Sequence, residues 1–201
     1  MNVRLWILSL VICLAATRNV SAVVVSHEFS GVVAYSNVSG VAVNDPFTVV
    51  LTYDTNQPDL EPADSSIGRY AGFTLSLDVG PISVSETNPE PYDLGIRDGA
   101  PGSPDGIVWA GGIGPGNIGL SAGDQTGTAF NSDALPLSLN MSSFSSAGFR
   151  HFVTGSTRVD GTILSISSRI VPEPSSLAIM LIALSGSLLR RHLLPTRLGG
   201  G

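Results

Sequence analysis

The sequence predicts an all-β domain, an antiparallel β-sandwich of the jelly-roll type, and three observations support that prediction. Residues 46–54 (PFTVVLTYD) and 72–80 (GFTLSLDVG) alternate apolar and polar side chains with a period of two. This period indicates strands that bury one face. Glycine- and proline-rich turns recur along the chain, and no stretch between residues 23 and 170 has the period of a helix. We therefore expect about eight antiparallel strands with short connections.

The other predicted strands lie between turn-forming dipeptides such as Asp98-Gly99 and Asp160-Gly161. They comprise residues 23–36, 82–86, 106–109, 135–140, 149–154 and 157–170. We interpret the glycine-rich region from Asp93 to Gly127 as a set of turns between short strands. Trp109 is the only tryptophan of the predicted domain, and its apolar setting (GIVWAG) places it in the core of a strand.

The predicted domain is acidic. Residues 23–171 contain five arginines, no lysine and fifteen aspartates or glutamates, which gives a net charge of −10. Nucleic acid calls for a cationic surface, so we expect no nucleic-acid partner. The single cysteine, Cys13, lies outside these residues, which excludes a disulfide, a thiolate metal ligand or a cysteine nucleophile within them. A domain of this length can still bury enough apolar surface to fold without disulfides.

The first 22 residues have the three parts of a secretory signal peptide. Arg4 supplies the positive start, residues 5–16 form the apolar segment, and Val20-Ser21-Ala22 is a small-residue cleavage site. We predict export through the Sec machinery and cleavage by signal peptidase after Ala22. The alternative is a retained anchor helix, for which the apolar segment is short, since a span needs about 20 residues.

A second apolar segment lies near the C-terminus. Residues 175–189 would form a helix of roughly 22 Å, at about 1.5 Å per residue, and Arg190 and Arg191 follow directly. The segment is apolar on every face, which suits lipid better than the alternative, a helix on the surface of the main domain. Because basic clusters stay on the cytoplasmic side, we predict one transmembrane helix over residues 175–189, with the domain of residues 23–170 outside the cytoplasm.

The motif Val171-Pro172-Glu173-Pro174-Ser175 stands directly before this helix and its Arg-Arg cluster. Together, residues 171–192 resemble the PEP-CTERM sorting signal of Gram-negative bacteria. The resemblance implies an exosortase, an integral-membrane cysteine transpeptidase-like enzyme, which recognises the signal and processes the protein near Pro172, Glu173 and Pro174. It also implies an inner-membrane anchor before processing, and then a place at the cell surface or outside the cell. Residues 193–201 extend beyond the usual pattern as a short cytoplasmic tail.

One loop has the residue types of a calcium site. Carboxylate and amide oxygens are the ligands that Ca²⁺ prefers, although the spacing matches no EF-hand. The alternative is a solvated surface connection, since two prolines interrupt the loop and Asp and Asn are common in turns. The candidate ligands are Asp54, Asn56, Asp59, Glu61 and Asp64.

Signals of catalysis are few. The two histidines of the predicted domain, His27 and His151, are too separated for a zinc motif, and the sequence has no Gly-x-Ser-x-Gly, phosphate-loop or dinucleotide motif. We therefore expect a non-enzymatic surface or extracellular-matrix protein without a cofactor. The alternative is a secreted carbohydrate-binding or carbohydrate-active module that uses calcium and contacts extracellular polysaccharide.

Overall fold

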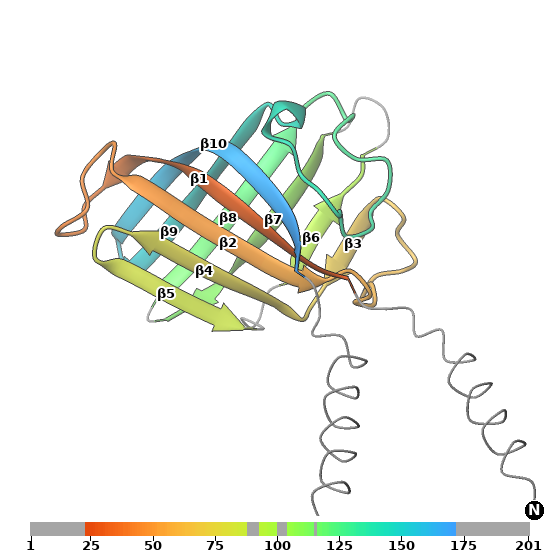
Figure 1. The fold of residues 1–201 in the computed structure, drawn as a ribbon, viewed down its shortest axis with the longest axis horizontal. Coiled ribbons are helices and arrows are strands. Elements are labelled where there is room, and N and C mark those ends of the chain that lie inside the picture. Colours follow the sequence, from red (N-terminus) through yellow and green to blue (C-terminus); the bar gives the residue numbers. More distant parts are fainter. Residues whose placement is uncertain (1–22, 88–92, 100–103, 115, 172–201) are drawn as a thin grey trace, which may run out of the picture.

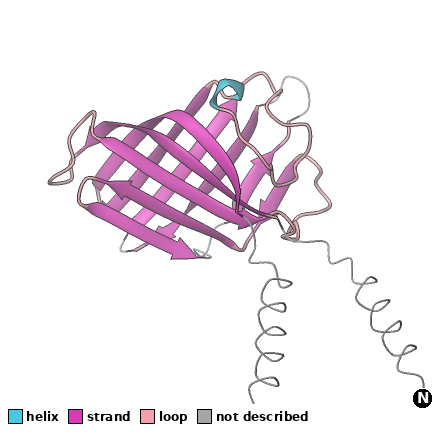
Figure 2. Ribbon diagram, in the orientation of Figure 1, coloured by secondary structure: helices cyan, strands magenta, loops and turns pink. Residues whose placement is uncertain are grey.

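The computed structural model describes residues 23–87, 93–99, 104–114 and 116–171, and strands joined by turns and loops make up this part of the chain (Figures 1 and 2). A single 3-10 turn, η1 (Met141–Ser143), lies between two of the strands. The all-β prediction is confirmed. The ten strands are β1 (Val24–Ser36), β2 (Pro46–Asp54), β3 (Ile67–Tyr70), β4 (Phe73–Val79), β5 (Ile82–Thr87), β6 (Leu94–Arg97), β7 (Asp105–Ile113), β8 (Gly116–Asp124), β9 (Ser146–Thr154) and β10 (Thr157–Val171).

The strands form one continuous antiparallel sheet in the order β3-β6-β7-β8-β9-β10-β1-β2-β4-β5. Strands β6 to β10 follow one another as a meander, and β10 then pairs with β1, which leads into the other half of the sheet. Figure 1 shows that the sheet curls, so that the half containing β2 and β4 lies over the half containing β7, β8 and β9. The expected jelly roll of two separate sheets is therefore corrected to one curled sheet that packs against itself.

The core lies between the two halves, on what we call the inner face of the sheet. Alternate residues of each strand point into it, as their burial shows; in β2 and β4 every second residue is 3 % exposed or less. Two aromatic pairs cross from one half to the other: the ring centroids of Phe47 and Phe149 are 4.4 Å apart, and those of Phe73 and Trp109 are 5.7 Å apart. Trp109 is 1 % exposed, which confirms its predicted place in the core.

The pairing of β1 with β10, which joins the two halves, is irregular. Its register shifts between Ser30 and Gly31 and again between Val33 and Tyr35. Such bulges bend a strand and increase its twist. At Gly161 of β10, an added Cβ atom would lie only 2.2 Å from Cε1 of Phe149 and 2.6 Å from Cε1 of Phe47. Glycine at this position therefore leaves room for Phe47 and Phe149 to pack together, and this contact joins the two halves of the sheet.

Two of the hairpins turn on glycine. Gly80 begins the connection between β4 and β5, and Gly155 begins that between β9 and β10, with φ angles of 53° and 54°. Each connection has two residues, because Val79 pairs with Ile82 and Thr154 pairs with Thr157. A positive φ at the first of two turn residues is the geometry in which glycine is favoured, since it has no side chain to clash.

The predicted strands differ from the structure in two respects. Residues 135–140 are not a strand: they belong to a loop whose Leu135 and Leu139 are each 7 % exposed, and polar side chains of the sheet hold the loop in place. Conversely, β3 falls on a segment without a strand prediction, and β6 and β8 lie in the region predicted as turns between short strands, where their bounds were not predicted. In β8 the inward Ile118, Leu120 and Ala122 alternate with small residues, and these obscured the strand signal.

Candidate binding surface on the outer face of the sheet

The two ends of the described domain lie side by side. Val24, the first residue of β1, pairs with Val171, the last residue of β10 (Figure 1). The predicted cleavage site at Ala22 and the predicted transmembrane helix over residues 175–189 lie outside the described residues, as do Pro172, Glu173, Pro174, Arg190 and Arg191. Within the described part, no helix has the length and apolar character needed to cross a membrane.

The loop predicted to bind calcium uses its carboxylates within its own turns. Asp54 Oδ1 accepts the Asn56 N–H at 2.9 Å, and Asp59 Oδ1 accepts the Glu61 N–H at 2.9 Å. Asp64 Oδ1 accepts both the N–H and the hydroxyl of Ser66, which lower the pKa of this carboxyl. Such local bonds are the usual reason for Asp in turns.

Two further contacts of the loop involve Arg69. Its backbone N–H donates to Asp59 Oδ1 at 2.8 Å, and its guanidinium lies 3.3 Å from the Glu61 carboxylate. Within the described ranges, no three side chains of His, Cys, Asp or Glu gather closely enough to share a metal ion. The structure therefore brings the five candidate ligands into one loop but not around one point, and calcium binding stays a prediction.

Two buried carboxylates lie opposite each other on β7 and β8 and serve the loops at that end of the sheet. Asp105 is 2 % exposed and accepts the N–H groups of Gly99 and Phe130 at 2.8 and 2.9 Å. Asp124 is 4 % exposed and accepts the N–H and hydroxyl groups of Thr126 and Thr128, which hold its pKa well below the usual value. These bonds occupy both carboxylates and explain their burial without a catalytic role.

A buried hydrogen-bond chain surrounds His27, which is fully buried on the inner face of β1. Tyr53 donates its hydroxyl to the Pro136 carbonyl at 2.7 Å, so His27 Nε2, at 2.6 Å, donates to the Tyr53 oxygen. Nδ1 then accepts from the hydroxyl of Ser168 at 2.7 Å, and Ser168 in turn accepts the Leu139 N–H at 2.9 Å.

This chain fixes the 135–139 loop over the inner face and requires a neutral imidazole. Burial lowers the pKa of His27 to about 4 and raises the pKa of the Tyr53 phenol. Both pKa shifts keep the two side chains uncharged near neutral pH. In that state both imidazole nitrogens and the phenol oxygen have hydrogen-bond partners. His151, 1 % exposed, contacts the Asn117 carbonyl from Nδ1 at 3.1 Å, and its pKa is also lowered by burial. His151 is thus an ordinary inward strand residue, as predicted.

The opposite, outer face of β6 to β9 is hollowed because its central residues are small. Along neighbouring strands the outward positions hold Gly95, Ala110, Gly119 and Gly148 in place of larger side chains. Two open hollows, of about 310 and about 570 Å³, share Val108 and Ala110 as lining residues. We call this combined surface, which extends from Arg69 of β3 to Asp160 and Thr162 of β10, the outer hollow.

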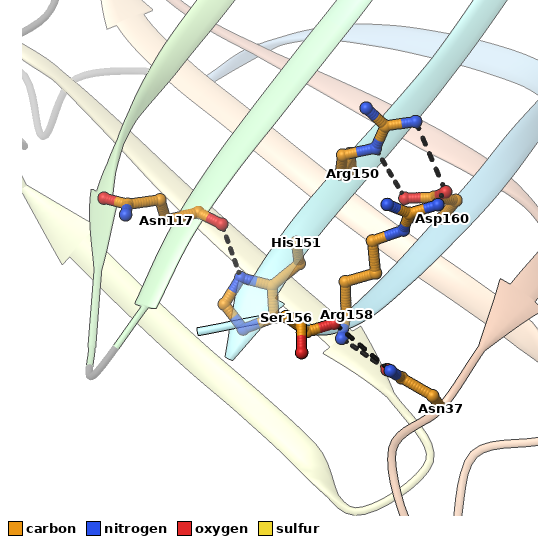
Figure 3. A network of polar contacts seen from close by, with 7 residues as sticks. All are labelled: Asn37, Asn117, Arg150, His151, Ser156, Arg158 and Asp160. Carbon is orange, nitrogen blue, oxygen red and sulfur yellow. Dashed lines mark hydrogen bonds and ion pairs between the residues drawn. The ribbon is translucent and has the colours of Figure 1, made fainter. Parts of the chain in front are cut away.

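Three arginines line the outer hollow: Arg69 and Arg97 at one end, and Arg150 near the other. Arg150 donates to Asp160 through Nε at 2.8 Å and through a terminal nitrogen at 3.4 Å. Arg158 lies 3.2 Å from the second oxygen of the same carboxylate. Figure 3 shows both guanidinium groups converging on Asp160. One carboxylate therefore orients two cations at this end.

Aromatic rings and an anchored loop complete this end of the surface. Arg150 lies 5.9 Å from the ring centroid of Phe152, and Arg158 lies 4.9 Å from that of Tyr35, whose side chain is 43 % exposed. Asn37, in the β1–β2 connection, accepts the Arg158 N–H at 2.6 Å and donates to the Ser156 carbonyl at 3.1 Å (Figure 3). This side chain ties the connection to the β9–β10 hairpin.

Sequence reasoning found neither the outer hollow nor the His27 chain. Arg69, Arg97 and Arg150 are far apart in the sequence, and two of them lie on β3 and β6, whose bounds were not predicted. A usable signal was present for His27, because it occupies an inward position between Val25 and Phe29. No protein-family model matches this chain, and no curated protein or solved structure matches it either.

Proposed function

We propose that this protein is an exported, non-enzymatic surface or extracellular-matrix protein, and that an exosortase sorts it through residues 171–192. One observation of the fold supports the proposal most: Val24 and Val171 are paired neighbours. The predicted signal peptide and the predicted sorting signal therefore adjoin the same corner of the domain. A domain whose two ends leave at one corner can be held close to a membrane by either end without distortion.

In this proposal the Sec machinery exports the chain and signal peptidase cleaves after Ala22. The transmembrane helix over residues 175–189 then holds the protein in the inner membrane, with Arg190, Arg191 and the 193–201 tail on the cytoplasmic side. Exosortase acts near Pro172, Glu173 and Pro174 and releases the domain to the cell surface or the medium. Since β10 ends at Val171, the enzyme acts on residues directly next to the folded sheet.

Mass spectrometry of the mature C-terminus tests the proposal. In a host with the exosortase we expect the protein to end near Glu173, and in a host without it we expect the unprocessed tail. A Pro172→Ala, Glu173→Ala, Pro174→Ala variant should keep its tail in both hosts. Glu86→Ala, which removes an exposed acidic side chain of β5, is the matched control and should be processed normally. An identical C-terminus in both hosts would refute sorting by this route.

The outer hollow favours a second candidate function, that of a carbohydrate-binding module. A sugar site is often built on an exposed tryptophan. Here Trp109 lies in the core, and arginines are the most numerous charged residues that line the surface. The charge and shape of this surface therefore decide which ligand it would take.

A further inference from the structure

We propose that the outer hollow binds an acidic polysaccharide, a chain of sugars bearing carboxylates of the uronic-acid type. The proposal rests on the exported location proposed above, since such polymers lie outside the cell. It is derived from three properties of the surface: its charge, its length and floor, and the side chains along its rim.

The lining of the outer hollow contains more arginines than acidic residues, whereas the domain as a whole contains more acidic residues than arginines. Its lining contains three of the five arginines of residues 23–171, but only two of the fifteen acidic residues, Asp93 and Asp160. Asp160 is paired with Arg150 and Arg158, and Arg69 is paired with Glu61. Arg97 is exposed, and among the described residues no carboxylate lies within 4 Å of its guanidinium. An acidic domain thus has one face where a polyanion meets cations.

The shape suits a chain better than a small anion. The surface crosses six neighbouring strands, from β3 to β10, which at about 4.8 Å per strand is roughly 24 Å. Apart from Val108, which is 52 % exposed, the floor consists of the small residues Gly95, Ala110, Gly119 and Gly148, so there is room for sugar rings along it. A single carboxylate or phosphate would use only one end of this length.

The rim offers the contacts that a uronic-acid chain needs. Guanidinium groups bind carboxylates through two parallel hydrogen bonds. Arg97 on β6 and Arg150 on β9 lie three strands apart, roughly 14 Å at about 4.8 Å per strand, so they can meet charges on separate sugars. Arg150 lies over the Phe152 ring and Arg158 over the Tyr35 ring, and these contacts hold both guanidinium groups along this rim. Asp93 and Asp160 lie between or beside the arginines and would repel a densely charged polyphosphate, which favours the more dilute charge of a uronic-acid polymer.

The test uses the full-length protein in a nonionic detergent, with oligogalacturonate as the probe and its fully methyl-esterified form as the uncharged control. Calorimetry should show binding of the charged oligomer only, and the affinity should fall as salt is raised, because screening weakens exposed ion pairs. Arg97→Gln and Arg150→Gln should each weaken binding about fivefold.

Arg169→Gln is the matched control, since it removes the same charge from β10 opposite Ser26, outside the outer hollow, and should leave binding unchanged. Equal loss in this variant would overturn the proposal, as would equal binding of the esterified oligomer or no binding to the wild type. Binding to polyphosphate but not to oligogalacturonate would assign the face to phosphate-rich polymers and also overturn it. Processing of the C-terminus is measured separately, so failure of sorting and failure of binding are distinguishable.

Discussion

The two halves of the curled sheet bury similar inner faces but have different outer faces. In β2 and β4 the outward residues are mostly threonine, serine and aspartate, which cover the sheet. In β7 and β8 the outward residues are mostly glycine, alanine and serine, which leave it bare. The apolar residues of the inner face stabilise both halves, whereas the size of the residues on the outer face determines whether there is room for a ligand. The half with the weaker strand signal is therefore the half with the candidate site.

The largest effect is expected where the two halves join. Gly161→Val places a branched side chain where even a Cβ atom would be 2.2 Å from the Phe149 ring. We expect a loss of about 3 kcal/mol in the free energy of unfolding, because the aromatic pair can no longer close. The urea midpoint measures it. Thr162→Val, the adjacent outward and exposed position, is the control; equal midpoints for the two variants would contradict this account.

An intermediate effect is expected from acid, through the His27 chain. Burial lowers the pKa of His27 to about 4 in the folded protein from 6.5 for an ordinary histidine, so the unfolded chain binds more protons between these pH values. Stability is therefore highest above about pH 6.5 and falls as the pH is lowered toward 4. Between pH 7.5 and 5 the expected loss is about 2 kcal/mol.

Urea unfolding at the two pH values checks this effect. His27→Gln keeps hydrogen-bonding atoms but does not titrate, so it should be less stable at pH 7.5 and should lose most of the pH dependence. The residual dependence belongs to His151, whose pKa is also lowered. A wild-type protein equally stable at both pH values would rule out the His27 mechanism.

The smallest effect on stability is expected from filling the bare half. At Gly119 an added Cβ atom would meet only the Trp109 carbonyl oxygen, at 3.9 Å. Gly119→Thr should therefore raise the unfolding free energy by up to about 1 kcal/mol, since threonine favours strands. It should also weaken oligogalacturonate binding. Ser76→Thr makes a similar change on the outer face of β4 and should leave binding intact; an unaltered affinity in Gly119→Thr would show that the floor is not used.

The inner faces explain how much of the fold the sequence predicts. Strand β2 was predicted with its observed bounds and β4 to within one residue at each end, because both their faces follow the period of two. Strand β8 was missed although Ile118, Leu120 and Ala122 alternate, since glycine between them is typical of turns. Residues 135–140 were predicted as a strand because they are apolar at intervals, yet they cover the core as a loop.

The candidate site was harder to predict than the fold, for a physical reason. Its charge comes from arginines on β3, β6 and β9, and only the strand order brings these together. That order depends on long-range pairing, which a local pattern does not encode. The calcium hypothesis had the opposite weakness: its residues are close in sequence, but backbone N–H groups of the same loop occupy three of the carboxylates.

The pairing of the first strand with the last also sets an order of events in time. β1 and β10 are neighbours in the middle of the sheet, so neither half can be joined to the other until residues 157–171 are present. Contacts between such distant parts of a chain form slowly. If the chain is exported N-terminus first, as proposed, the sheet is completed only when the last residues before Pro172 have crossed the membrane. A finished fold would then coincide with the arrival of the predicted sorting motif.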